Sequence, residues 1–173
     1  RLNNLSSTNQ TIVDIGCGEG YYLSRFQKEM APESTKLYGM DISKLGIRIA
    51  AKKNTTIQWL VANFANLPFT DKSVSTVLSM FAEYSVPEID RILTDEGNII
   101  IVRAASDHLI ELKNIIYPEI HEKVKASSIK TFPGFLVEQE NYSYQVTIQS
   151  TEDLLSLLLM TPHYWKIKPE GIE

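Results

Sequence analysis

The sequence contains almost no cysteine: Cys17 is the single one among 173 residues. A lone thiol excludes a disulfide framework, and also any zinc site made of several cysteines within this chain. Sequences so poor in cysteine are typical of reducing compartments, so we expect a cytoplasmic protein. Long apolar runs are also missing, because the longest, 154–160, is far shorter than the roughly 20 residues that span a bilayer. We therefore expect no membrane partner.

Positive charge is in short supply as well. The 17 lysines and arginines are outnumbered by 21 aspartates and glutamates, which gives a net charge of −4. Surfaces that bind nucleic acid are usually basic, so this balance does not by itself predict a nucleic-acid partner. What is present is ordinary for a globular protein. The 43% of hydrophobic and 22% of charged residues argue against disorder, collagen and coiled coil.

Strand-like and helix-like segments alternate along the chain. Apolar and β-branched runs predict strands at 11–15, 36–41, 57–62, 74–80 and 98–103, the last after a turn at 95–97. Helical periodicity predicts helices at 19–30, 44–53 (capped by Ser43), 86–93, 107–117 and from Thr151 onward. A solvent-facing loop is expected at 118–135 and a further strand at 135–149. This alternation predicts an α/β fold with a mostly parallel sheet covered by helices on both faces.

Three of the eight glycines, Gly16, Gly18 and Gly20, lie directly after the first predicted strand. Open α/β sheets bind nucleotides at this place, where glycine permits a close backbone approach to the ligand. A dinucleotide fingerprint needs G-x-G-x-x-G, but here the third glycine comes one residue early. With Asp14 in the strand, the pattern Asp-x-Gly-x-Gly-x-Gly is typical of Rossmann-like methyltransferases that use S-adenosylmethionine (SAM). Asp14 can help to position the ammonium group of SAM. The alternative is a glycine-rich turn that binds nothing.

Two further positions fit an adenosine. Asp41 ends the second predicted strand, where a carboxylate can accept hydrogen bonds from both ribose hydroxyls; the alternative role is a helix cap. After the third predicted strand, the amide oxygen of Asn63 can accept from the adenine amino group. Phe64 can flank the adenine ring, or it can be a residue of the core. Neither position distinguishes SAM from other adenosine cofactors.

Three segments together resemble one family, the bacterial 23S ribosomal RNA (guanine-N1)-methyltransferases. They are Val13–Tyr22, the run from His108 to Tyr117, and Met160–Trp165. The resemblance implies a class I SAM-dependent catalytic domain over residues 1–173. It further implies methyl transfer to N1 of a guanine in a 23S rRNA hairpin, and a link to antibiotics that act on the ribosome. It also implies that Cys17, Gly18 and His108 bind SAM.

The motif and the resemblance together give a set of expected SAM-binding residues near the glycine cluster and the ends of the predicted strands. The set is Asp14, Gly16, Cys17, Gly18, Glu19, Gly20, Tyr22, Asp41, Ile42, Asn63, Phe64 and His108. Guanine N1 must lose a proton before it attacks, so a general base is useful. The candidates are His108, Asp107 and Glu83, and no spacing singles one out.

The resemblance also implies features outside this sequence. The family has an amino-terminal zinc-binding module and a closing strand at the other end. Neither has a counterpart here, so we expect the chain to be part of a longer protein and to hold no metal itself. Tyr164 and Trp165, beside Lys166, are candidates for RNA contact, or else a hydrophobic plug. A homodimer is a further expectation. The alternative functions are a SAM methyltransferase of small molecules, and a non-catalytic SAM-binding module.

Overall fold

The structure is a computed structural model that describes residues 10–30, 34–116, 132–161 and 164. The described chain falls into two compact units: one runs up to Ala104 and includes Phe132, and the other begins at Ala105. Whether 1–173 forms a single catalytic domain therefore stays a prediction. No helix within the described ranges is both long and apolar enough to cross a membrane.

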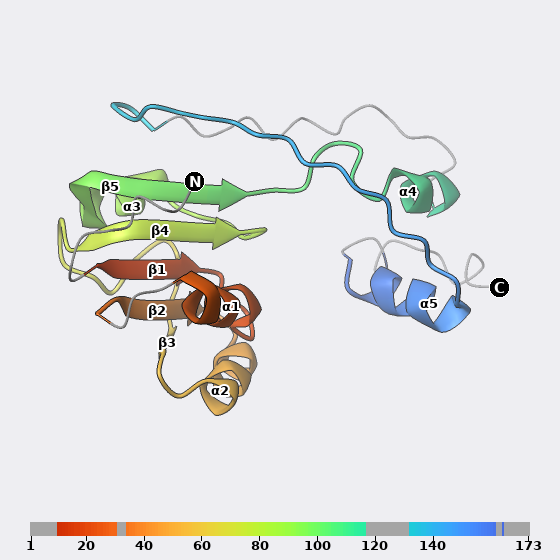
Figure 1. The fold of residues 1–173 in the computed structure, drawn as a ribbon, viewed down its shortest axis with the longest axis horizontal. Helices are drawn as coiled ribbons and strands as arrows, with labels where there is room; N and C mark the ends of the chain where they lie inside the picture. The colour runs from red at the N-terminus through yellow and green to blue at the C-terminus, as the bar shows by residue number, and fades with distance from the viewer. Residues whose placement is uncertain (1–9, 31–33, 117–131, 162–163, 165–173) are drawn as a thin grey trace. The chain divides into compact units, whose positions relative to one another are not determined.

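The first unit is built on a five-stranded sheet in the order β3-β2-β1-β4-β5 (Figure 1). Its strands are β1 (Thr11–Ile15), β2 (Lys36–Asp41), β3 (Gln58–Val61), β4 (Val74–Met80) and β5 (Leu93–Val102). All four neighbouring pairs are parallel. The helices between them are α1 (Tyr21–Met30), α2 (Lys44–Lys53) and α3 (Val86–Ile92). The predicted parallel α/β fold is confirmed, and its chain order reverses beside β1.

A buried apolar cluster joins the first helix to the sheet. Its members come from four strands or strand starts and from α1: Ile12, Leu23, Leu37, Ile57 and Leu78. Burial of each such side chain contributes roughly 1.5–3 kcal/mol. The helical periodicity that predicted α1 has its physical origin here, since Leu23 is fully buried while Tyr21 and Tyr22 on the same helix are exposed. This packing holds the start of α1, and the glycine cluster before it, at the carboxyl end of β1.

We expected a turn at 95–97 and the fifth strand only after it. This expectation is wrong, because β5 begins at Leu93 and runs through these residues. The pairing of β4 with β5 jumps from Val74–Leu93 to Thr76–Asn98, so the extra residues of β5 form an irregularity inside the strand. Such bulges insert residues without ending the strand, and glycine often marks them. The Asp-Glu-Gly text is therefore a bulge signal. Ser43 caps α2 as expected, since its hydroxyl accepts the N–H of Gly46 at 3.1 Å.

The second unit contains α4 (Ile110–Ile116) and α5 (Thr151–Leu159). The helix expected from Thr151 is confirmed, with Ser150 as its N-cap. The strand expected at 135–149 is wrong, because these residues have no regular structure. Their alternating side chains are exposed, 82% for both Tyr142 and Tyr144. A strand needs a neighbour for its hydrogen bonds, and alternation alone does not supply one. Most of the expected 118–135 loop lies outside the described residues.

Candidate functional site

The glycine cluster forms a tight turn that is tied to the neighbouring strand. Gly16, Gly18 and Gly20 have φ angles of 74°, 55° and 79°, a region that other residues rarely adopt. The backbone N–H groups of Gly16 and Cys17 both donate to the carbonyl oxygen of Met40, at 2.8 and 3.0 Å. These bonds fix the turn over the carboxyl end of β2. The sequence thus places three glycines where the backbone requires them.

The three glycines have different surroundings. A Cβ on Gly16 would lie 2.3 Å from the Cβ of Ala82, and one on Gly20 would lie 2.3 Å from the indole of Trp59. Both are therefore required by packing within the protein. A Cβ on Gly18 would meet nothing within 4 Å. Of the three, Gly18 alone faces open space, and it is the one whose backbone a ligand can approach.

The contact of Gly20 with Trp59 gives a first testable prediction. The indole also covers Gly39 and donates from Nε1 to the carbonyl oxygen of Asn54 at 2.7 Å, so it cannot move aside freely. Gly20→Ala should therefore lower the free energy of unfolding by about 2–4 kcal/mol, the sum of overpacking and of a positive φ. Trp59→Leu in the same chain should restore at least about 1 kcal/mol relative to additivity.

Urea denaturation of the two single variants and the double variant measures this coupling. Gly134→Ala is the matched control, because Gly134 also has a positive φ and a Cβ there would meet nothing within 4 Å. It isolates the cost of the φ angle alone. Strictly additive effects of Gly20→Ala and Trp59→Leu would show that the indole does not limit the turn.

Asp41 holds the turn from the end of β2. Its Oδ2 accepts the N–H of Gly18 at 2.9 Å, and its Oδ1 accepts the N–H of Ser43 at 2.8 Å. The sequence left a ribose contact and a helix cap open for this residue. The N-cap of α2 is Ser43, and Asp41 accepts the N–H of this cap residue from two positions earlier in the chain. Each carboxylate oxygen can accept a second hydrogen bond, so the ribose role is compatible with these contacts.

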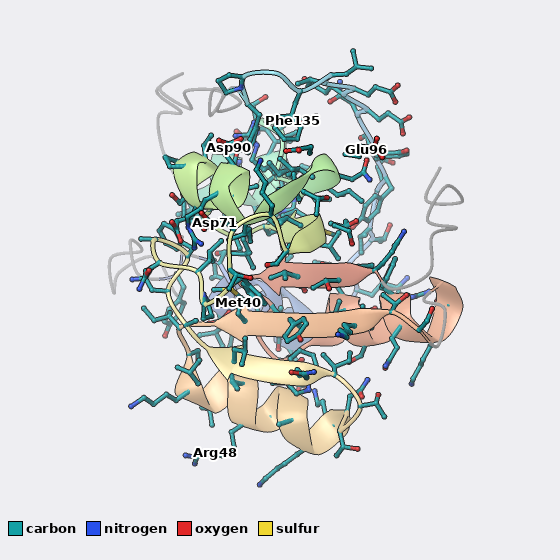
Figure 2. The ribbon with its side chains drawn as sticks, turned by 90° about the vertical axis from the view of Figure 1, so that its left-hand side faces the viewer. Met40, Arg48, Asp71, Asp90, Glu96 and Phe135 are labelled. Atoms are coloured by element: carbon teal, nitrogen blue, oxygen red, sulfur yellow. The ribbon has the colours of Figure 1, made fainter. Side chains whose placement is uncertain are left out.

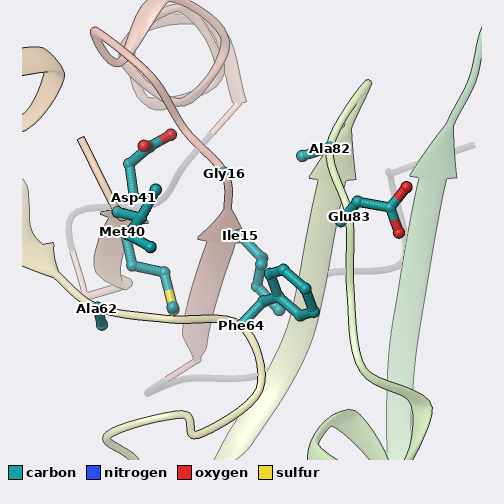
Figure 3. A pocket seen from close by; sticks show the side chains of 9 residues that line it. Ile15, Gly16, Met40, Asp41, Ala62, Phe64, Ala82 and Glu83 are labelled. Carbon is teal, nitrogen blue, oxygen red and sulfur yellow. The ribbon is translucent and has the colours of Figure 1, made fainter.

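A cavity of about 210 Å³ opens beside the turn (Figure 3). Its lining comes from the ends of β1, β2 and β4 and from the segment after β3: Ile15, Gly16, Met40, Asp41, Ile42, Ala62, Phe64, Ala82 and Glu83. Most of this lining is apolar. The Asp41 carboxylate lies on the side of the glycine turn, whereas the carboxylate of Glu83 points away from it, toward β5. Cofactor sites are mostly apolar with a few placed polar groups and usually measure about 300–1,000 Å³, so this cavity has the matching lining and the size for part of a cofactor.

The structure brings some predicted residues to the cavity and leaves others aside. Phe64 and Ile42 line it. The amide oxygen of Asn63 accepts the N–H of Ala65 at 2.9 Å, so its first hydrogen bond stays within the local turn. Glu19 forms an ion pair with Lys53 at 2.6 Å on the surface. The expected contacts of Asn63 and Glu19 with a cofactor stay predictions.

Two buried groups lie at the start of the turn. Burial raises the pKa of the Cys17 thiol to about 12, so it stays protonated and does not act as a nucleophile. Asp14 is 1% exposed, and neither carboxylate oxygen has a hydrogen-bond partner. Burial, and then the nearby charge of Asp41, raise the pKa of Asp14 to about 7. An unpaired buried carboxylate is costly, which marks Asp14 as unusual within the fold.

Two of the candidates for a general base lie in the second unit. Asp107 and His108 come just before α4, where the N–H of His108 donates to the carbonyl oxygen of Ala105 at 3.1 Å. Their relation to the cavity stays a prediction. Glu83 is the candidate that the structure places at the cavity. The expected RNA contact Tyr164 is described, whereas Trp165 and Lys166 lie outside the described residues.

The aromatic residues beside the turn were missed as a group. The ring of Tyr22 lies 5.2 Å from that of Tyr21 and 6.3 Å from that of Phe81, between ring centroids. Tyr21 and Phe81 are more than half exposed, and Phe81 has a φ of 57°. A non-glycine residue held in that region is uncommon and often belongs to a functional site. No sequence pattern predicts such a conformation.

The sequence also gave no sign of the network that holds the segment after β3. Glu88 accepts the N–H of Leu67 at 2.6 Å, and Arg91 donates to the carbonyl oxygens of Leu67 and Phe69 at 3.0 and 2.8 Å. Arg91 also pairs with Glu88 at 2.8 Å and with Asp71 at 2.9 Å. These hydrogen bonds and ion pairs connect helix α3 to the loop that follows Phe64. Asp71 in this loop and Asp90 in the helix are labelled in Figure 2.

This network predicts a pH dependence of stability. The Arg91 guanidinium and the Leu67 N–H lower the pKa of Glu88 to about 2, from an ordinary value of 4.5. The stabilisation is therefore fully present above pH 4.5 and is lost as the pH falls toward 2. The gap in unfolding free energy between wild type and Glu88→Gln should shrink over that window. Denaturation at pH 6, 4 and 3 measures it. Glu29→Gln is the control: Glu29 pairs with Arg25 on an exposed helix surface, so this variant should differ little from wild type in unfolding free energy at any pH. A difference between wild type and Glu88→Gln that stays constant with pH would contradict the prediction.

Comparison with known proteins agrees with this geometry. The family model of a methyltransferase domain matches residues 12–97, which run from β1 into β5. A SAM-dependent methyltransferase from Aquifex aeolicus superposes with a TM-score of 0.52 at 22% identity, over 57% of this chain and 58% of that one. The PH0226 protein of Pyrococcus horikoshii OT3 gives 0.54 at 20% identity, over 67% and 58%. The chain matches the methyltransferase-domain family model over residues 12–97 and has the class I SAM-dependent methyltransferase fold.

The similarity to particular relatives extends further along the chain. The 23S rRNA (guanine(748)-N(1))-methyltransferase of Streptomyces fradiae is 36% identical over 93% of this chain. A Bacillus subtilis (strain 168) protein with the provisional name 23S rRNA (guanine-N(1)-)-methyltransferase YxjB is 38% identical over 94%. The chain covers 58% and 59% of their lengths, so it spans less than two thirds of either relative. The resemblance read from the three segments is confirmed as a similarity to relatives with these names.

Proposed function

We propose that the protein transfers a methyl group from SAM to N1 of a guanine in 23S ribosomal RNA. The observation that carries the proposal is the cavity beside the glycine turn. Gly16 and Asp41 line this cavity, and Asp41 also accepts the N–H of Gly18, at which an added Cβ would meet nothing within 4 Å. The chain's similarity over more than nine tenths of its length to proteins named for this reaction supports the choice of substrate.

The residues around the cavity fit the parts of SAM. Asp41 would accept from the ribose hydroxyls, Phe64 and Ile42 would flank the adenine, and Asn63 would accept from its amino group. The turn at Gly18 would pass close to the amino-acid tail, with Asp14 acting on its ammonium group. When bound, SAM supplies a methyl group on a sulfonium, which makes that carbon electrophilic. The remaining expected contacts, from Cys17, Glu19, Gly20, Tyr22 and His108, belong to the same proposal.

The protein's contribution to the chemistry is mainly positioning. Guanine N1 must lose its proton and lie in line with the methyl group, and a fixed geometry supplies much of the rate. Glu83 is placed at the cavity, so it is our first candidate for a proton acceptor, ahead of Asp107 and His108. Because its carboxylate points toward β5, this role requires a change of rotamer.

The substrate side is supported by the exposed aromatic rings. Tyr21, Tyr22 and Phe81 stand beside the turn, and aromatic faces are the usual supports for bases extruded from RNA. A net charge of −4 supplies little attraction for phosphates. We therefore assign most of the RNA affinity to parts of the longer relatives that this chain does not match, among them the zinc-binding module of the family. A homodimer, a cytoplasmic location and a link to antibiotic resistance stay parts of this proposal.

Incubation of the protein, at the full length of its natural chain, with 23S rRNA and SAM carrying a labelled methyl group tests the function. We expect 1-methylguanosine, identified by mass analysis of the digested RNA, at one position of 23S rRNA and not in 16S rRNA. N1-methylation blocks base pairing, so reverse transcription should stop at the same nucleotide. Methyl transfer to a different atom, or to small molecules only, would contradict the proposal and favour the alternative substrate class. SAM binding without any transfer would favour a non-catalytic module.

A further inference from the structure

Asp14 is a buried acid whose charge nothing in its surroundings balances. It lies inside β1 and is 1% exposed, and both of its oxygens lack a hydrogen-bond partner. The residues level with it on the neighbouring strands are Gly39 and Leu78, neither of which can ionise. No ion pair among the described residues involves it. A buried carboxylate without a partner is either neutralised by a proton or stabilised by a cation that binds nearby.

Of the two titratable groups near Asp14, Asp41 opposes its ionisation and Cys17 does not compensate its charge. Asp41 brings a second negative charge from the end of β2, and its own oxygens are held by Gly18 and Ser43. Cys17, in the turn, keeps its thiol proton and supplies no positive charge. The pKa of Asp14 is accordingly raised to about 7. In the cofactor-free protein near neutral pH, a large share of the molecules therefore carries a proton here.

We propose that the ammonium group of SAM displaces this proton, so that cofactor binding is coupled to release of a proton from Asp14 into solvent. The proposal rests on the proposed function insofar as SAM is the ligand. The ammonium need not touch the carboxylate, because an opposite charge within about 4–6 Å favours the ionised form of an acid. A Cβ on Gly18 would meet nothing within 4 Å, so the turn that follows β1 has open space beside its backbone for the amino-acid tail.

The number of protons released on binding, and the resulting pH dependence of affinity, follow from the change in the pKa of Asp14. A nearby cation lowers a carboxyl pKa by roughly 1–3, and a change from about 7 to about 5 releases about 0.7 of a proton at pH 6.5. Affinity should then be about eightfold tighter at pH 7.5 than at pH 6.0. Higher pH adds a second effect, since the ligand's own amine has a pKa of roughly 7.7–8.0. The informative window therefore lies between pH 6.0 and 7.5.

Calorimetric titration in buffers of different ionisation enthalpy counts the protons. The probes are S-adenosylhomocysteine, which keeps the ammonium, and 5′-methylthioadenosine, which has the same adenosine and sulfur but no amino-acid tail. At pH 6.5 we expect release of about 0.7 of a proton with the first and none with the second. Asp14→Asn imitates the protonated acid, so it should abolish the release and flatten the pH dependence. Asp95→Asn, from an exposed pair with Lys72, should leave both unchanged.

The outcomes separate the proposal from the function on which it rests. Binding of S-adenosylhomocysteine without proton release at pH 6.5 would overturn the proposal and leave SAM binding intact. Equal release with both probes would also overturn it, since the ammonium would then play no part. Failure of both probes to bind would contradict the proposed function itself. If Asp14→Asn does not fold, the comparison of the two probes on the wild-type protein decides alone.

Discussion

Gly18→Val should reduce the affinity for S-adenosylhomocysteine at least about 100-fold while the protein keeps its fold. Among the three glycines of the turn, Gly18 is the one whose added side chain would enter open space and not meet the protein. That space is where the backbone must approach the cofactor, so the valine methyl groups would exclude it. The loss corresponds to roughly 2.7 kcal/mol of binding free energy.

The same substitution has a separate cost in stability. A φ of 55° is unfavourable for a β-branched residue, and we expect a loss of about 1–2 kcal/mol in unfolding free energy. Gly134→Val is the matched control, since Gly134 has a φ of 85° and open surroundings in the second unit. It should show a similar loss of stability and an unchanged dissociation constant. Equal cofactor affinity in Gly18→Val and wild type would remove the turn from the binding site.

Asp41→Ala should weaken binding of the same ligand by about 1.5–3 kcal/mol, or roughly 10- to 150-fold. One part of this loss is the charged acceptor for the ribose hydroxyls. The other part is the turn itself, because Gly18 and Ser43 lose the oxygens to which their N–H groups donate. Calorimetric titration gives the affinity, and thermal unfolding reports the structural share separately.

A second variant separates the contribution of the ribose contact from that of the support that Asp41 gives to the turn. Asp41→Asn keeps an oxygen for one backbone donor but removes the charge, so its affinity should fall between those of wild type and Asp41→Ala. An unchanged dissociation constant in Asp41→Ala, together with lowered stability, would restrict Asp41 to supporting the turn and the start of α2. That result would contradict the ribose assignment and leave the glycine turn as the remaining carrier of the site.

Local patterns predicted the part of the fold that holds the site. Strands β1, β2 and β4 coincide with the predicted ranges, because β-branched runs between turn residues are a local signal. The glycine cluster was equally readable, since positive φ angles restrict the residue type at each position. The position of the Asp41 carboxylate at the end of β2 was also predicted, because Asp41 is the last residue of the second strand-like run. These features depend on neighbours within a few residues.

Contacts between distant residues could not be predicted in this way. Trp59 lies under Gly20 and Ala82 lies against Gly16, although each pair is far apart in sequence. The alternation at 135–149 predicted a strand, but the hydrogen bonds of a strand come from a partner that the pattern does not identify. In each case the deciding neighbour was not visible in the local sequence.

The central claim is that the cavity at the carboxyl ends of β1, β2 and β4 holds SAM. A crystal structure of the protein with S-adenosylhomocysteine tests it most directly. We expect the ribose hydroxyls at Asp41, the adenine between Ile42 and Phe64, and the sulfur on the side of Ala82. The amino-acid tail should follow the backbone at Gly18. A ligand bound elsewhere on the protein, or adenine placed away from the segment that follows β3, would contradict the assignment of the site.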